Sequence, residues 1–197
     1  MNSIQPEDAA SQPAGQKPAA LGVMNFLMDI LETLILAVVL FVGINAVSAR
    51  IRVDGASMEP TMHHNELVVV NRLGYRFGLP ERGDVIVFHF PRDPEQEYIK
   101  RVIGLPGDRI AIANGVVMVN EHPLDEPYIS APPRYTGDWT VPADYLFVLG
   151  DNRNLSSDSH EWGMLPLDYV IGKAIFIYWP LSEMGTIAHV SLATPIP

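Results

Sequence analysis

The sequence predicts a mainly β protein that carries one N-terminal helix long enough to span a membrane. Residues 26–49 form its only apolar run of membrane length. From residue 50 onward, short runs of β-branched residues alternate with Gly, Pro and Asn, without any helical periodicity. These observations predict a single transmembrane helix followed by an antiparallel β domain over residues 50–197.

Residues 1–25 are predicted to be a disordered tail. The first 20 of them are rich in Pro, Ala, Gln and Ser and have almost no large apolar side chains. A segment of this composition buries too little surface to offset the entropy that it loses on ordering.

The apolar run 26–49 is predicted to cross a membrane. Residues 33–49 contain no ionisable side chain, and Asp29 and Glu32 lie near the start of the run. At about 1.5 Å per residue, the run can cross a bilayer core of ~30 Å. A cleaved signal sequence is one alternative, but the preceding tail is mainly acidic and the run exceeds the usual ~7–15 apolar residues. A buried core helix is the other alternative.

The β domain is predicted to contain eight short strands, with long loops at 120–140 and 150–166. The clearest local signal is Asn114-Gly115, because this pair supplies the positive φ angles of a tight hairpin turn. The predicted strands are Arg50–Val53, Glu66–Asn71, Val85–Phe90, Tyr98–Ile103, Arg109–Ala113, Val116–Asn120, Tyr145–Leu149 and Val170–Trp179.

The composition excludes several classes of function. Cysteine is absent, so disulfides, a thiolate nucleophile and cysteine metal sites are excluded. The formal net charge of -10 opposes binding to a phosphate backbone, and we expect no nucleic-acid partner. His63 and His64 would point to opposite faces of an extended segment, which argues against a metal site there. We therefore expect no metal and no cofactor.

Four segments carry residues with chemical potential, although each alone is also typical of a turn. A serine between a nearby glycine and a nearby proline, as at Ser57, becomes a nucleophile only if a base accepts its proton. The segments are Ser57–Thr61, Arg82–Phe88, Tyr98–Asp108 and Gly150–Ser159.

Lys100 is one candidate for that base. Strand alternation puts Lys100 on the same face as Tyr98 and Val102, where a desolvated amine would favour its neutral form. The alternative is that its side chain extends from a strand edge into solvent. The six histidines offer a rival Ser-His-Asp arrangement, with His63 and His64 nearest to Ser57 in the sequence.

Taken together, the four segments resemble one known family. An apolar segment followed by SMEPT, RGDVIVF, YIKRVIGLPGD and GDNRNLSSDS is similar to the bacterial type I signal peptidases, the membrane-bound Ser-Lys endopeptidases of protein export. The resemblance covers about residues 30–180. It implies the signal peptidase type of β catalytic domain over residues 50–197 and the removal of signal peptides that end in small residues of the Ala-X-Ala type.

The resemblance also implies roles for particular residues. Ser57 matches the nucleophile, Lys100 matches the general base, and Ser156 matches the serine whose hydroxyl holds the lysine amine. A neutral group suits this last role, because a nearby carboxylate would restore the charge of the amine.

The remaining supporting residues are expected to stay away from the amine. Asp158 matches the acidic residue that supports the serine loop, and Asp151 and Arg101 match a pair that ties this loop to the lysine strand. Two positions depart from a common family pattern: Gly55 lacks a hydroxyl that could stabilise an oxyanion, and His160 stands where many members have arginine. The pairing of His160 with Asp158 would therefore depend on pH.

A substrate site follows from the same resemblance. An extended signal peptide is expected to lie between residues 53–55 and 98–100 and to add a strand to the sheet. The alternative is that the expected pocket residues belong to the core. The positions concerned are Val53, Gly55, Met62, Val87, Tyr98 and Ile99.

The resemblance implies a plasma-membrane protein whose partners are preprotein signal peptides, the lipid bilayer and the protein export machinery. It places residues 1–25 in the cytoplasm and the β domain on the extracytoplasmic side. The charges that flank the apolar run suggest the opposite orientation, because Arg50 and Arg52 follow it and only Lys17 precedes it. A domain of this size crosses a membrane largely regardless of such charges, so we expect the extracytoplasmic location.

Two other classes of function remain as alternatives. One is an anchored β domain without catalytic activity that serves as a scaffold or binding module. The other is a related Ser-Lys protease, such as a self-cleaving repressor, although the chain has no DNA-binding region.

Overall fold

The protein divides after Ile44 into two units, Met1–Ile44 and Asn45–Pro197. A computed structural model describes residues 19–76 and 78–190 of the chain. Most of the first unit is helix, and the second contains two antiparallel sheets.

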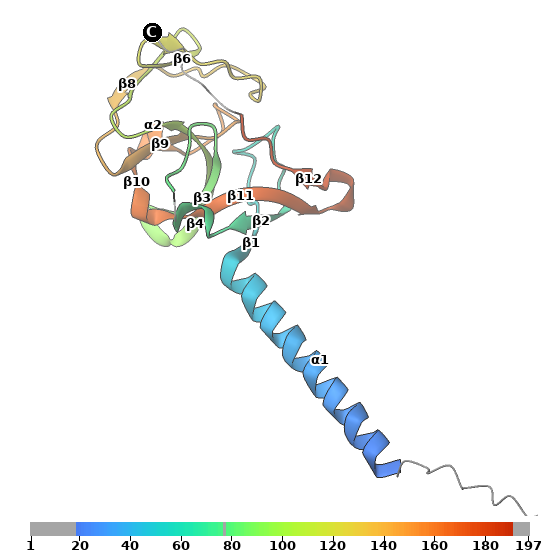
Figure 1. Cartoon of the computed structure of the whole chain (residues 1–197). Helices are drawn as coiled ribbons and strands as arrows, with labels where there is room; N and C mark the ends of the chain where they lie inside the picture. The colour runs from blue at the N-terminus through green and yellow to red at the C-terminus, as the bar shows by residue number, and fades with distance from the viewer. Residues whose placement is uncertain (1–18, 77, 191–197) are drawn as a thin grey trace, which may run out of the picture. The chain divides into compact units, whose positions relative to one another are not determined.

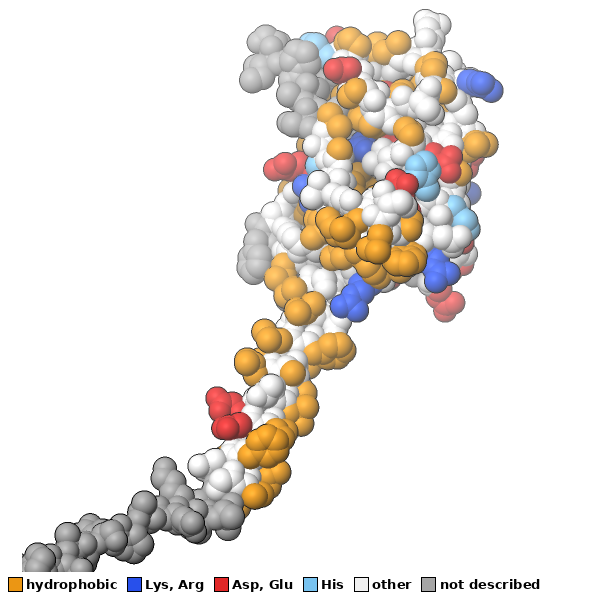
Figure 2. Space-filling view, turned by 90° about the vertical axis from the view of Figure 1, so that its right-hand side faces the viewer, with side chains coloured by type: hydrophobic (Ala, Val, Ile, Leu, Met, Phe, Trp, Pro, Cys, Tyr) orange, Lys and Arg blue, Asp and Glu red, His pale blue; other side chains and the backbone are white. Residues whose placement is uncertain are grey.

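Helix α1 (Ala19–Val47) confirms the predicted apolar helix but has different boundaries. It begins within the segment predicted to be disordered, because Ala19, Ala20 and Leu21 are strong helix formers; residues 1–18 lie outside the described residues. It ends before residue 48, where the first strand starts. The stretch Gly22–Asn45 has a mean hydropathy of 2.4 and is long enough to span a membrane. Apolar side chains run along its exposed surface (Figure 2).

The larger sheet brings together segments that are far apart in the sequence. Strand β11, drawn in orange, lies between β2 and β3 (Figure 1). A strand near the C-terminus thus pairs with two strands from the first part of the β unit. The short strand β12 (Gly185–Thr186) pairs with β11. The main order is β1 (Ser48–Arg52), β2 (Leu67–Asn71), β11 (Val170–Trp179), β3 (Val85–Phe90), β4 (Asp93–Gly104), β9 (Tyr145–Leu149) and β10 (Leu165–Pro166).

The smaller sheet contains the predicted hairpin. Strands β5 and β6 pair from Ala113 opposite Val116, and the two turn residues have φ angles of 52° at Asn114 and 79° at Gly115. Both angles are positive, which confirms the predicted turn. The order is β7 (His122–Pro123), β6 (Val116–Val119), β5 (Arg109–Ala113) and β8 (Gly137–Thr140).

The eight predicted strands are all present, with small shifts in their ends. Strand β4 is longer than predicted because Asp93 pairs with Phe90 at the start of the β3–β4 hairpin. Apart from β6, sequence periodicity missed the elements of two to four residues, because a pattern cannot be recognised over so few positions. These are β7, β8, β10, β12, helix α2 (Ser159–Trp162) and the 3-10 turns Gly74–Arg76, Leu167–Tyr169 and Leu181–Glu183.

Three hydrophobic clusters form the core of the β unit. One of them includes Met58 and Met62 from the loop between β1 and β2, packed with Val87 of β3 and Ile99 of β4. The loop that carries Ser57 is therefore fixed to the core of the larger sheet.

Candidate active site

Ser57 lies in the loop that joins β1 to β2, where buried side chains hold the backbone. The adjacent Met58 and the nearby Met62 are fully buried, and the Met62 N–H donates to the Met58 carbonyl at 3.0 Å. Ser57 itself is half-buried, so its hydroxyl lies at the boundary between core and solvent.

Lys100 lies on β4, and its amine contacts the Ser57 hydroxyl. Lys100 Nζ is 2.8 Å from Ser57 Oγ and also donates to the Ile99 carbonyl at 2.8 Å. Only 4% of Lys100 is exposed. This burial lowers the pKa of the Lys100 amine to about 8, although the charges of Asp158 and Asp151 act in the opposite direction. An appreciable neutral fraction at physiological pH can then accept a proton from Ser57.

No histidine forms a hydrogen bond with the Ser57 hydroxyl in the described part of the chain. His64, one of the two nearest in sequence, instead accepts the N–H of Gly55 at 3.1 Å and lies 3.4 Å from the Asp54 carboxylate. Within residues 19–76 and 78–190, no three His, Asp or Glu side chains are grouped so that they could hold a metal ion. The arrangement around Ser57 is therefore that of a Ser-Lys pair.

A second loop, residues 150–158, packs directly against the Ser57 backbone. Asn152 donates from its N–H to the Ser57 carbonyl and from its amide side chain to the Ala56 carbonyl, both at 3.1 Å. A Cβ atom on Gly150 would lie 2.4 Å from the Ser57 carbonyl oxygen and 2.2 Å from Ser156 Oγ. Only glycine therefore allows the two loops to approach this closely.

Ser156 lies close to the Ser57 carbonyl, beside Gly150, but is not bonded to Ser57 or Lys100 in this structure. Ser156 is 6% exposed, and its hydroxyl has no hydrogen-bond partner among the described residues. The Lys100 amine bonds to Ser57 and to the Ile99 carbonyl instead. The bond to the amine that the resemblance implies is absent here, and the role of Ser156 stays a prediction.

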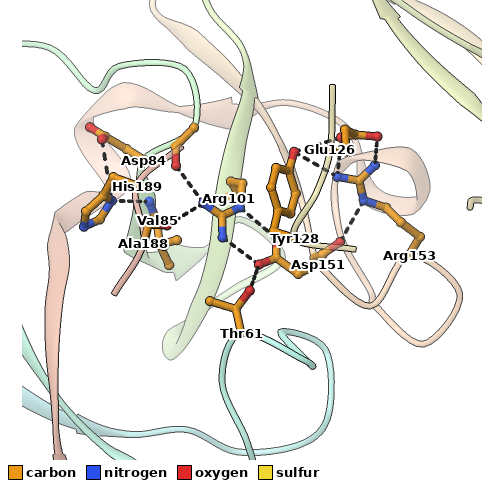
Figure 3. Close-up of polar contacts among 12 residues, drawn as sticks. Thr61, Asp84, Val85, Arg101, Glu126, Tyr128, Asp151, Arg153, Ala188 and His189 are labelled. Carbon is orange, nitrogen blue, oxygen red and sulfur yellow. Dashed lines mark hydrogen bonds and ion pairs between the residues drawn. The ribbon is translucent and has the colours of Figure 1, made fainter. Parts of the chain in front are cut away.

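Arg101 and Asp151 form a buried ion pair one residue away from Lys100. Arg101 Nε and Nη2 donate to the two Asp151 oxygens at 2.8 and 2.7 Å, and both side chains are fully buried. Thr61, from the Ser57 loop, donates its hydroxyl to the same carboxylate (Figure 3). The carboxylate thus links the Ser57 loop, the lysine strand and the loop 150–158.

Asp158 supports the same loop through backbone amides and a histidine. It accepts the N–H of Gly150 at 3.0 Å and caps α2 by accepting the N–H of His160. Its other partner is His160 Nδ1, at 2.6 Å. Burial lowers the pKa of His160, but the hydrogen bond and charge of Asp158 outweigh this effect, so the net shift is upward. The His160 ring stacks on Tyr135 at 3.8 Å between centroids.

A cleft of about 750 Å³ opens beside Ser57 and Lys100. One wall is formed by residues 50–52, 54 and 55 and the other by residues 96–100. Among the described strands, residues 50–52 pair only with β2 and residues 97–100 only with β3. Each wall therefore presents an unpaired strand edge, and an extended peptide could bind there as an added strand.

The structure divides the predicted substrate residues into two groups. Gly55 lines the cleft, as do Tyr98 and Ile99. The other three do not reach the cleft surface, because their side chains face the cluster that holds Ile99. Their exposed fractions are 2% for Val53, 0% for Met62 and 0% for Val87.

A family model described as signal peptidase, peptidase S26, matches residues 27–179. The chain belongs to the signal peptidase family. This confirms the family resemblance that the four motifs predicted, and the enzyme is a serine peptidase of the signal peptidase I class. The mainly antiparallel β fold with an apolar N-terminal helix agrees with this assignment.

Individual members of the family are similar over most of the chain. Signal peptidase I of Leptolyngbya laminosa is 42% identical over 193 residues, which cover 93% of this chain and 94% of that protein. Signal peptidase I of Bacillus caldolyticus is 42% identical over 148 residues, which cover 68% of this chain and 80% of that protein. A crystal structure of a signal peptidase I from Enterococcus faecalis V583 is 34% identical, with a TM-score of 0.43 over 49% of this chain and 97% of that one.

The signal peptidase motifs contain further site residues that the sequence analysis left without a role. Thr61 closes the SMEPT motif and bonds to Asp151, and Asn152 of the GDNR motif bonds to the Ser57 backbone. Arg153 of the same motif donates to the Gly150 carbonyl at 3.0 Å. Their positions inside the motifs were the available signal, but only the folded chain reveals their partners.

Proposed function

We propose that this chain removes N-terminal signal peptides from exported preproteins, with Ser57 as nucleophile and neutral Lys100 as general base. The observation that carries the proposal is the 2.8 Å contact between Ser57 Oγ and a Lys100 amine that is buried and has a lowered pKa. A buried neutral amine is the form of lysine that can activate a hydroxyl near neutral pH.

The chemistry proceeds in two stages. Ser57 Oγ forms a bond to the carbonyl carbon of the scissile peptide while Lys100 Nζ takes the hydroxyl proton. The C–N bond then breaks, and the ammonium returns the proton to the leaving amine. Water, activated by the same amine, hydrolyses the resulting ester and frees Ser57. The backbone N–H of Ser57 is the proposed oxyanion donor, since the N–H of Gly55 is bonded to His64.

The cleft supports an extended substrate. Its two walls present unpaired strand edges, and both end near the catalytic pair, at Gly55 and at Lys100. Backbone hydrogen bonds to these edges would hold the peptide, while side-chain specificity would come from the residues between them. We propose that Tyr98 and Ile99 restrict the cleavage site to small side chains by steric exclusion.

The apolar helix supports attachment to the plasma membrane by a single span, with its surface in contact with lipid. We propose that the β unit lies on the extracytoplasmic side, where the export machinery would present signal peptides. An external protease added to intact cells should degrade this unit. Protection of the β unit would place it in the cytoplasm and contradict this part of the proposal.

The catalytic assignment is tested with purified full-length protein in detergent and a preprotein substrate. We expect Ser57→Ala and Lys100→Ala to lower kcat by about 1,000-fold or more, because members of such a pair act as a unit. Ser182→Ala is the control, because this exposed serine lies in the turn after β11. Cleavage by Ser57→Ala at the wild-type rate would eliminate the proposed pair, and a folded wild type without cleavage would favour a binding module.

A further inference from the structure

A buried tyrosine lies between two arginines behind the catalytic loops. The Tyr128 ring has the Arg101 guanidinium 4.1 Å from its centroid and that of Arg153 at 5.8 Å (Figure 3). The exposed fractions are 9% for Tyr128, 0% for Arg101 and 1% for Arg153. Cations that are desolvated against a ring face interact with it more strongly than exposed ones. Tyr128 thus connects the lysine strand with the loop 150–158.

Glu126 holds this arrangement together through three hydrogen bonds. Its two oxygens accept from Arg153 Nη1 at 2.8 Å and Nη2 at 2.6 Å, and one of them also accepts from the Tyr128 hydroxyl at 2.8 Å. The Glu126 side chain is 6% exposed. Bidentate pairing fixes the guanidinium in one orientation as well as balancing its charge.

That orientation directs the remaining Arg153 nitrogen, Nε, toward the loop that packs against Ser57. Arg153 Nε donates to the Gly150 carbonyl at 3.0 Å, and the Gly150 N–H is held by Asp158. Ser156 and the Ser57 carbonyl both lie so close to Gly150 that a Cβ atom there would clash with each of them. A shift of Arg153 would therefore move the peptide unit against which the Ser57 backbone packs.

We propose that Glu126 and Tyr128 are positioning residues for the Ser57–Lys100 pair. Glu126 acts through Arg153 and Gly150 on the Ser57 backbone, and Tyr128 acts through Arg101 on the lysine strand. Both residues lie in the segment between β7 and β8, which contains none of the four motifs. The inference rests on the proposed function, because it assumes that Ser57 and Lys100 perform the chemistry.

The first test replaces the carboxylate by an amide. Glu126→Gln removes the charge that orients Arg153 and should lower kcat by about 10- to 100-fold, with KM changed by less than about threefold, because small misplacements of reacting groups are costly. The matched control is Glu121→Gln, in the nearby turn between β6 and β7. Its side chain is 84% exposed and lies 3.8 Å from Arg109, so kcat should stay at the wild-type value.

The second test does not leave a buried charge unpaired. Tyr128→Leu removes the ring and should lower kcat by about 10-fold, whereas Tyr128→Phe keeps the ring and should stay within about threefold of wild type. Cleavage of a signal-peptide substrate is measured at a temperature where circular dichroism indicates that each variant is folded. The separation of kcat from KM distinguishes positioning from substrate binding.

The outcomes separate this inference from the proposed function. If folded Glu126→Gln and Tyr128→Leu keep the wild-type kcat, or change only KM, while Ser57→Ala is inactive, the positioning role is wrong and the Ser-Lys assignment stands. If Ser57→Ala cleaves like wild type, the proposed function itself fails. A fall in kcat for both folded variants, with restoration in Tyr128→Phe, supports the inference.

Discussion

The hydroxyl of Ser57 and the amine of Lys100 lie 2.8 Å apart, although 43 positions separate them in the chain. Ser57 comes from a loop and Lys100 from the middle of a strand, so their distance depends on how the loop is fixed to the sheet. The buried methionines of the loop and the Asp151 carboxylate provide that attachment.

The lowered pKa of Lys100 predicts a pH dependence of cleavage. Below about pH 8 the amine is mostly an ammonium ion and cannot accept the Ser57 proton, so kcat/KM should rise with pH through this value and then level off. Steady-state cleavage of a peptide substrate between pH 6 and 10 measures this rise in kcat/KM. A flat profile over that interval would mean that Lys100 is not the base.

Ser156→Ala separates catalysis from stability. The Ser156 hydroxyl is buried and has no hydrogen-bond partner within the described part of the chain, so its removal should leave Tm unchanged or raise it slightly. If the hydroxyl bonds to the lysine amine during the reaction, kcat should nevertheless fall by about 10-fold or more. Circular dichroism melting and cleavage rates measure the two effects. An unchanged kcat would remove Ser156 from the catalytic support.

Asp151→Asn tests the buried ion pair. Arg101 would keep its charge in a fully buried position without its partner, so the free energy of unfolding should fall by roughly 3–5 kcal/mol. Asp138→Asn is the matched control, because this carboxylate pairs with Arg109 on the surface and should contribute less than about 1 kcal/mol. Denaturant unfolding in detergent measures both. If the two variants lost similar amounts of unfolding free energy, the buried pair of Asp151 would contribute no more than the surface pair.

His160→Arg should keep activity and remove a pH dependence of stability. The pKa of His160 is raised by Asp158 in the folded protein, so the His160–Asp158 pair contributes to folding stability. That contribution is fully present below the pKa of an unfolded histidine, about 6.5, and is lost as pH rises through the pKa of folded His160. Arginine keeps its charge throughout, so the decline of Tm above about pH 6.5 should flatten. His122→Arg, outside the Asp158 contacts, should leave the decline in place. If Tm declined identically with pH in His160→Arg and in the wild type, the His160–Asp158 pair would not contribute to the stability of the fold.

The sequence determined the broad architecture because local patterns carry that information. An uninterrupted apolar run specifies a helix of membrane length, and Asn114-Gly115 specifies a hairpin by its backbone angles. The motifs also determined the family, since motif residues lie close together in the chain. They did not reveal where α1 begins, although the residues there are strong helix formers, or the shortest strands, where tertiary pairing overrides weak local preference.

Only the tertiary structure decided which residues meet at the site. Val53, Met62 and Val87 match pocket positions in the sequence, yet they face the core, because burial depends on how distant strands close over each side chain. Glu126 and Tyr128 belong to none of the four motifs. The fold nevertheless brings Tyr128 against Arg101 and Glu126 against Arg153, from two other segments of the chain. Contacts between distant parts of the chain arise from packing of the whole core, and no short stretch of sequence contains that information.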